Sequence, residues 1–186
     1  MFSAVEDGKT FRNSVTNALY PMTPPDDPIE ALKILAETVE DDMFLLHETD
    51  KGHRSVAYVC CYCSGFNPSQ KLDKLLDEIH EPVPSYHKIG PSMERYFSRV
   101  QVGKNVKRVN SRMRVELQTL SRLPGTRAVL FSFKTHLYTL DEIKAEGLGP
   151  QLADAIDGLK QGNAPDMWTY KGAVRWGKKV KEYLRS

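Results

Sequence analysis

The residue with the clearest chemical potential is His80, which stands where a predicted helix must end. Asn67 can cap that helix and Pro68 suits its first position, because the first turn needs a side-chain acceptor and can spare an N–H. An apolar stripe recurs at i, i+3, i+4 and i+7, made of Leu72, Leu75, Leu76 and Ile79. His80 falls at the edge of this stripe, and the following Pro82 stops the helix. Such an imidazole suits an axial ligand to a flat apolar cofactor, and it suits a structural capping role equally well.

A second set of chemically active side chains lies on a predicted strand, residues 112–120. Strand side chains alternate, so Arg114, Glu116 and Gln118 share one face. An arginine and a carboxylate on one face can hold a charged ligand or move a proton. The same residues are also typical of a solvated sheet face with cross-strand salt bridges to Lys134. From the sequence, both interpretations stay open.

The three cysteines, Cys60, Cys61 and Cys63, crowd one apolar segment. An odd, clustered set does not make a disulfide framework. Cys60 and Cys63 have C-x-x-C spacing, which can indicate redox or metal chemistry, but the sequence offers no second pair to complete a site. An extended strand would also direct the two thiols to opposite faces. We therefore expect buried free thiols in a core strand.

The other histidines are weaker candidates than His80. His136 lies on the polar face of a predicted returning strand, and His47 and His87 have no distinctive setting. His53 falls in a predicted turn, where we expect it to be solvated.

The predicted helices are separated by clear start and stop signals. A polar surface arm, residues 1–25, precedes a helix that starts at Asp27-Pro28 and ends near the acidic residues 40–42. After His80, residues 82–84 form a rigid Pro-x-Pro spacer, and a long helix starts at Pro91. Two more helices close the chain, over residues 151–162 and 167–186.

The predicted strands form two hairpins. Residues 43–48 and 55–63 are joined by a turn at 49–52, and the second strand, apolar on both faces, should lie centrally in the sheet. Residues 112–120 and 127–140 form an antiparallel hairpin with one apolar and one polar side. The pattern predicts an α+β domain, with four or five antiparallel strands and helices packed on one face.

Composition narrows the class of protein. The chain has 186 residues with 40% hydrophobic side chains, which suits a single domain spanning residues 1–186. Its net charge of +2 is spread along the chain, so we expect no nucleic-acid partner and no membrane partner. No apolar run approaches the length of a membrane span, and the N-terminus lacks a signal-peptide pattern, so we expect a soluble, cytoplasmic protein.

Five separated segments carry a resemblance to a known family: C-S-G-F-N-P-S-Q-K-L, E-I-H-E-P-V-P-S-Y, R-V-E-L-Q-T-L-S-R-L-P, F-S-F-K-T-H-L-Y-T-L and G-N-A-P-D-M-W-T-Y-K. In this order they resemble the haem-dependent oxidative N-demethylase α subunit and its fungal relatives. The resemblance implies a PAS-like fold that holds haem b and oxidises a small secondary amine. It also implies partner flavin and iron–sulfur components as electron donors. Relatives usually carry a longer insertion where this chain runs from Asn110 to Ser111, and usually have Tyr where His136 stands.

The resemblance also implies roles for individual residues. The family's His-x-Pro-Val-Pro motif places His80 as the axial ligand of the iron. Its strand motif falls on Arg114, Glu116, Gln118, Thr119 and Leu120. Arg114 would then bind a haem propionate and Glu116 would relay a proton or anchor the amine, with Arg122 and Lys88 as further propionate ligands. The alternatives are a non-catalytic PAS-like haem-binding or sensing module, and a structural domain with an apolar core in place of the cofactor.

Overall fold

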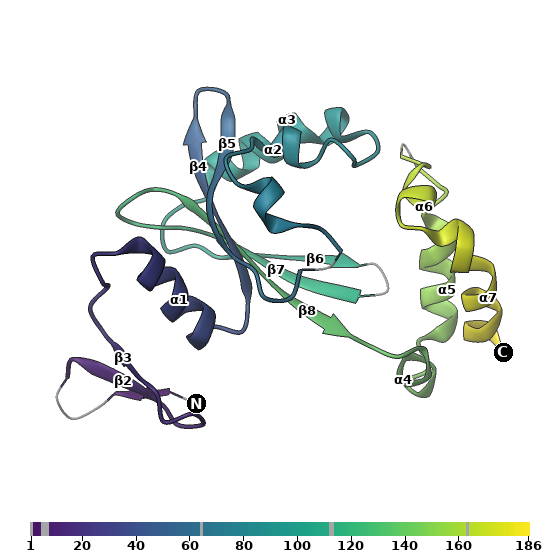
Figure 1. Cartoon of the computed structure of the whole chain (residues 1–186). Helices are drawn as coiled ribbons and strands as arrows, with labels where there is room; N and C mark the ends of the chain where they lie inside the picture. Colours follow the sequence, from purple (N-terminus) through teal and green to yellow (C-terminus); the bar gives the residue numbers. More distant parts are fainter. Residues whose placement is uncertain (1, 5–7, 64, 112–113, 163) are drawn as a thin grey trace.

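The computed structural model describes residues 2–4, 8–63, 65–111, 114–162 and 164–186. Within these ranges the main body is a five-stranded antiparallel sheet of order β5-β4-β8-β7-β6 (Figure 1). Its strands are β4 (Asp42–Thr49), β5 (Gly52–Val59), β6 (Val106–Ser111), β7 (Arg114–Arg122) and β8 (Val129–Leu137). The predicted α+β class and the antiparallel sheet are confirmed.

The β4–β5 hairpin turns where the sequence predicts it. Thr49 Oγ1 donates to the carbonyl of Gly52 at 2.7 Å, and Gly52 has a φ of 116°, which a side chain would strain. The predicted central position of the second strand is wrong, because β5 is an edge strand. Its free edge is covered by residues 73–75, with hydrogen bonds between Ser55 and the backbone of Asp73 and Lys74. The expected burial of both faces is also not seen, because Val56 on β5 is 47% exposed.

The cysteines follow β5 instead of lying within it. Asp42 is buried and its carboxylate accepts hydrogen bonds from the backbone N–H of Cys61 at 2.6 Å and of Tyr62 at 3.1 Å, which ends the strand. Cys61 and Cys63 are exposed and Cys60 is partly buried, so the prediction of three buried core thiols is wrong. Burial and the nearby Asp42 raise the pKa of Cys60 to about 12, which keeps it protonated.

The segment before His80 is not one helix. A short 3₁₀ helix, η1 (Pro68–Lys71), starts at Asn67, whose Oδ1 accepts from the N–H of Ser69 at 3.1 Å, so the predicted cap is confirmed. The chain then leaves the helical path because Asp73 has a φ of 60° and pairs with the edge of β5. A single helical turn, α2 (Leu76–Ile79), follows, and His80 ends it as predicted.

The connector and the next helix also differ from the prediction. Residues 82–84 fold into successive turns, with the N–H of Val83 donating to the carbonyl of His80 at 2.8 Å, and do not form an extended spacer. Helix α3 (Tyr86–Arg99) begins five residues before Pro91, which it contains. Pro91 is the sixth residue of α3, past the first turn, so it leaves the carbonyl of His87 without its helical hydrogen bond and weakens the helix there.

The register of β7 against β8 differs from the predicted one, in which the apolar residues of both strands share one face. Glu116 lies opposite Thr135 and Gln118 opposite Phe133, whereas Leu117 lies opposite Lys134. The polar side of β7 therefore shares a face with the apolar side of β8, and the prediction of one wholly apolar side is wrong. The sequence also missed β6, which pairs with β7; residues 112–113 lie outside the described residues.

The helices α2 and α3 cover this mixed face. The main core combines side chains of both helices with those of β4, β7 and β8: Phe44, Leu46, Leu76, Phe97, Leu120, Val129 and Phe133. Leu120 lies two residues from Gln118 on the same strand face, so Glu116 and Gln118 also point to the helical side of the sheet.

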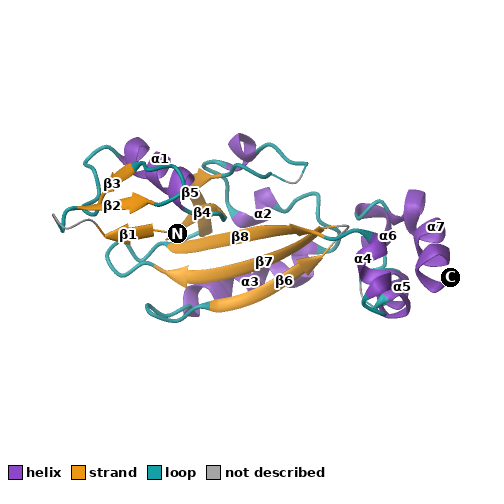
Figure 2. Ribbon diagram, turned by 90° about the horizontal axis from the view of Figure 1, so that it is seen from below, coloured by secondary structure: helices purple, strands orange, loops and turns teal. Residues whose placement is uncertain are grey.

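The C-terminal helices form a second cluster at one end of the sheet (Figure 2). They are α4 (Leu140–Ala145), α5 (Gly149–Gly158), α6 (Met167–Tyr170) and α7 (Ala173–Arg185). They share a core of their own around Ala153, Ile156 and Leu184. The predicted final helix is broken at Gly172, whose φ is 71°. Gly177 lets Trp168 pack closely, since a Cβ there would lie 2.4 Å from the indole.

The N-terminal segment, predicted as a surface arm, forms strands at the opposite end of the molecule (Figures 1 and 2). They are β1 (Phe2–Ala4), β2 (Thr10–Asn13) and β3 (Leu19–Pro21), and the rings of Phe11 and Tyr20 stack between the last two at 5.3 Å. Helix α1 (Pro28–Thr38) starts at Asp27, as predicted. No helix in the described ranges is long and apolar enough to cross a membrane.

Candidate functional site

The imidazole of His80 is held in one tautomer at the end of α2. Its Nδ1 lies 2.7 Å from the carbonyl oxygen of Leu76, which can only accept, so Nδ1 carries the proton and Nε2 keeps the lone pair. Burial lowers the pKa of His80, and the cations Lys71 and Arg108 act in the same direction. A neutral imidazole with one nitrogen bonded to a carbonyl is the form that binds a metal through the other nitrogen.

The ring of Tyr86 lies flat against this imidazole. The ring centroids are 4.7 Å apart and the planes differ by 4°. Tyr86 is 8% exposed, and its hydroxyl makes no hydrogen bond with the described residues. Burial raises the pKa of Tyr86 to about 12, with Glu94 and Asp77 adding to the effect, so the phenol is neutral. The turns after α2 have brought the first residue of α3 back onto His80.

Polar side chains of β7 and β8 lie on the helical side of the sheet. Gln118 is buried and its Nε2 donates to Glu116 Oε2 at 3.1 Å. Directly across the strands, the hydroxyl of Thr135 is buried without a hydrogen bond among the described residues. Arg114 belongs to β7 opposite Leu137, but its side chain lies outside the described residues.

In the described part of the chain, the ion pair of Lys134 is with Glu40 and not, as the sequence predicted, with the polar side of β7. Lys134 lies opposite Leu117 on the outer side of the sheet and pairs with Glu40. Thus β7 directs its polar face inward, and the interpretation as a solvated sheet face is wrong for Gln118. Arg108, opposite Gln118 on β6, brings a cation near His80 that the sequence missed because β6 was not predicted.

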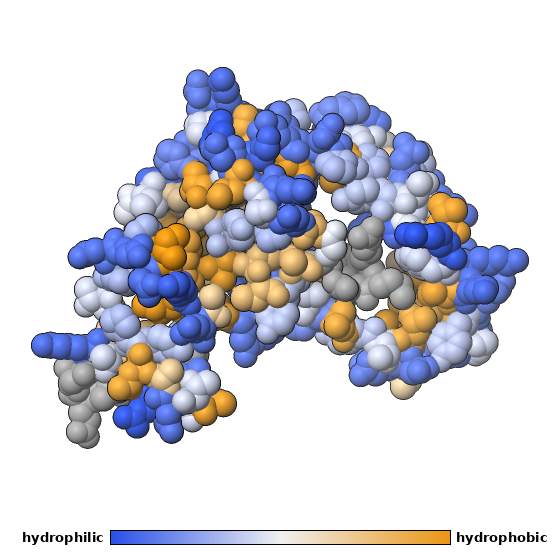
Figure 3. Space-filling view, in the orientation of Figure 1, coloured by the Kyte–Doolittle hydropathy of each residue, from blue (hydrophilic) through white to orange (hydrophobic). Residues whose placement is uncertain are grey.

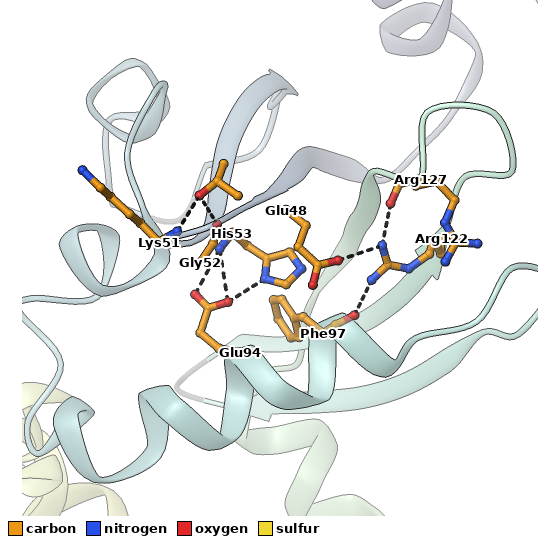
Figure 4. Close-up of polar contacts among 9 residues, drawn as sticks. Glu48, Lys51, Gly52, His53, Glu94, Phe97, Arg122 and Arg127 are labelled. Carbon is orange, nitrogen blue, oxygen red and sulfur yellow. Dashed lines mark hydrogen bonds and ion pairs between the residues drawn. The ribbon is translucent and has the colours of Figure 1, made fainter.

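Arg122 is buried at the other end of the same interface (Figure 4). Its guanidinium donates to the carbonyls of Val100, Phe97 and Arg127, each at 2.7 Å, and to Glu48 at 3.3 Å. Two of these acceptors are carbonyls at the C-terminal end of α3, and the carbonyl of Phe97 also accepts the N–H of Val100 at 3.2 Å. The N–H groups of the guanidinium donate to acceptors of the protein itself, which indicates a structural role for Arg122.

His53 is fully buried, so its predicted solvation is wrong. Its Nδ1 lies 2.5 Å from Glu94 Oε2, and its backbone N–H donates to the same carboxylate at 3.1 Å (Figure 4). The edge of the ring meets Phe97, and Nε2 is buried without a partner in the described part of the chain. The partner Glu94 is 41 residues away, so no local pattern could have shown this burial.

The remaining candidates lie outside this interface. Lys88 is on an exposed side of α3, and His136 stacks on Tyr138 on the outer face of β8. Among the described residues, no three His, Cys, Asp or Glu side chains gather around a common metal position. A haem iron needs only one or two protein ligands, so this finding leaves His80 as a candidate.

A groove lies beside Tyr86, and His80 is not among the residues that line it. In the space-filling view, apolar side chains gather in the middle of the visible face, whereas the surface above them, over α3, is mostly hydrophilic (Figure 3). The groove, of about 1080 Å³, runs along the α2–α3 connector and is lined by Tyr86, Glu94, Pro82 and neighbouring side chains.

A family model matches nearly the whole chain. The model is described as haem-dependent oxidative N-demethylase, alpha subunit-like, and it matches residues 1–113 and 110–181. The two matched segments meet at residues 110–113, beside the Asn110–Ser111 junction at which relatives were expected to carry an insertion.

Proposed function

The chain belongs to the haem-dependent oxidative N-demethylase alpha-subunit-like family, and from this premise we propose that it binds haem b with His80 as the axial ligand. The haem would lie beside His80 on the helical side of the sheet, next to the polar residues of β7 and outside the packed core of Leu76, Phe97 and Leu120. A PAS-like fold is part of the proposal. The strand order and the position of α2 and α3 between β5 and β6 support it.

The observation that carries this proposal is the state of His80. Its Nδ1–H is bonded to a carbonyl, burial favours the neutral ring, and Nε2 keeps a lone pair. The inner side of the sheet adds a buried hydroxyl without a partner in the described residues, at Thr135. The neutral imidazole supplies the donor atom that a haem iron needs, and this supports His80 as the ligand.

Cations near the site would bind the haem propionates. Arg114 and Lys88 stay in this role as predictions, and Arg108 joins them because its charge already acts on His80. Arg122 is the weakest of the four, because its guanidinium donates to three carbonyls and Glu48.

Glu116 would hold the substrate. A small secondary amine is protonated near neutral pH, and a carboxylate on the inner side of the sheet can bind the ammonium group and accept its proton. Gln118 fixes that carboxylate by donating to Oε2. When bound, haem would supply the oxidative chemistry at the methyl group, and the protein would supply binding, orientation and proton transfer.

The reaction also needs electrons from another protein. Oxidative removal of a methyl group consumes oxygen, two electrons and two protons, and it yields formaldehyde, a primary amine and water. The family name describes an alpha subunit, which implies further subunits. Flavin and iron–sulfur components remain our proposal for the electron donors.

Titration with haem tests the proposal. The purified chain should give a Soret band that saturates, and His80→Ala should abolish or shift that band. His87→Ala is the matched control, because His87 is an exposed histidine on α3. A spectrum unchanged by His80→Ala would remove His80 from the site, and a chain that binds no haem would favour a structural domain.

Turnover separates the enzyme from a haem-binding sensor. With haem, a chemical reductant, oxygen and a small secondary methylamine, the enzyme should release formaldehyde. Glu116→Gln should weaken amine binding while haem still binds. Haem-loaded protein that releases no formaldehyde would favour the sensing module.

A further inference from the structure

Two contacts define the orientation of the His80 ring. The hydrogen bond from Nδ1 to the carbonyl of Leu76 fixes one edge at 2.7 Å, but a ring held by one bond can still turn about it. The parallel ring of Tyr86, 4.7 Å away at 4°, removes that freedom. Together the two contacts fix both the edge and the plane of the imidazole.

Tyr86 is itself held from its other side. A Cβ placed on Gly90 would lie 2.9 Å from Cε1 of the Tyr86 ring, so the α3 backbone packs directly against it. Tyr86 is 8% exposed, and its N–H donates to the carbonyl of Val83 at 3.2 Å. The ring is therefore enclosed between the backbone of α3 and the imidazole.

We propose that Tyr86 is a positioning residue that sets the plane of the His80 ring and so the direction of its Nε2 lone pair. The inference rests on the proposed function, because the plane of the imidazole matters only if Nε2 binds iron. Groups that orient a metal ligand typically change metal affinity by about 10- to 100-fold when removed. Unlike those groups, Tyr86 would act through its ring face and not through a hydrogen bond.

Two substitutions of Tyr86 separate stacking from the hydroxyl. Tyr86→Leu removes the ring and should weaken haem binding by about 10- to 100-fold. At saturating haem it should also shift the Soret band and the reduction potential. Tyr86→Phe keeps the ring and should restore the wild-type band, potential and affinity. The unfolding midpoint of each variant without haem shows whether it is folded.

A substitution at Gly90 tests the same ring without altering it. Gly90→Ala places a methyl group against Tyr86, so the ring must shift, and the Soret band should move in the same direction as in Tyr86→Leu. This variant also carries the test if Tyr86→Leu does not fold.

The outcomes distinguish this inference from the proposed function. If the wild type binds haem through His80 but folded Tyr86→Leu and Gly90→Ala keep its band, potential and affinity, Tyr86 does not position the ligand. If the wild type binds no haem, the proposed function fails, and this inference fails with it.

Discussion

The two ends of helix α3 hold buried polar side chains in contrasting ways. At its C-terminal end Arg122 donates to three carbonyls and a carboxylate. Glu94, in the middle of the helix, holds the fully buried His53 through Nδ1, and Nε2 of His53 has no partner among the described residues. At its N-terminal end His80 has one hydrogen bond and a stacked ring, and it keeps a lone pair on Nε2. Charged groups saturated by the protein stabilise a fold, whereas an oriented lone pair can bind a ligand. We refer to these as the Arg122 end and the His80 end.

Removing the guanidinium should have the largest effect on stability. Arg122→Met removes the hydrogen bonds from the guanidinium to the carbonyls of Val100, Phe97 and Arg127, and we expect the free energy of unfolding to fall by about 3–5 kcal/mol. Chemical denaturation measures it. Arg127→Met is the control, because the exposed Arg127 contributes its backbone carbonyl to the network. Equal losses in the two variants would refute the structural role of Arg122.

His53→Leu should show that His53 stabilises the fold, whereas His80 binds the cofactor. The substitution leaves Glu94 without its imidazole partner, and we expect a loss of about 1–3 kcal/mol in unfolding free energy. Haem affinity of the folded protein should stay at the wild-type value, as measured by titration of the Soret band. A loss of haem binding with unchanged stability would place the cofactor near His53 and not near His80.

Thr135→Val tests the unpaired hydroxyl on the sheet. A buried hydroxyl without a partner costs free energy, so the haem-free variant should be more stable by up to about 1 kcal/mol. Thr119→Val, on the opposite face of the paired strand, is the comparison. Lower stability in Thr135→Val would mean that the hydroxyl is already satisfied in solution.

Protonation of Glu48 should make the stability of the protein depend weakly on pH. A hydrogen bond from Ser98, with the charges of His53 and Arg122, lowers the pKa of Glu48 below its ordinary value. A lowered folded pKa means that the stabilisation is present above the unfolded pKa and is lost as pH falls through the folded value. Stability of the wild type should therefore decline below about pH 5, and Glu48→Gln should make that decline shallower. Parallel curves would contradict the role of this carboxylate.

Much of the local structure could be predicted from the sequence. The caps at Asp27 and Asn67, the hairpin before Gly52 and the helix end at His80 all depend on residues within a few positions of each other. Such signals are readable because the backbone conformation that they specify is local. The family resemblance was also carried by sequence, and the family match confirms it.

What the sequence missed depends on distant partners. The register of β7 against β8 puts Gln118 beside Phe133 and leaves Leu117 at 41% exposure, although Leu117 is the more apolar of the two. Glu94 pairs with the buried His53 from 41 residues away, and Arg122 donates to the carbonyls of Val100 and Phe97, which are 22 and 25 residues away. A strand pattern alone does not fix which face meets the helices.

Chemical rescue of His80 tests the central claim most directly. His80→Gly removes the ligand and leaves space for a free imidazole, whereas His87→Gly removes an exposed histidine from α3. If His80 binds the iron, His80→Gly should lose the wild-type Soret band and regain its position when imidazole is added, and His87→Gly should keep it throughout. A His80→Gly protein with the wild-type band and no response to imidazole would contradict the account.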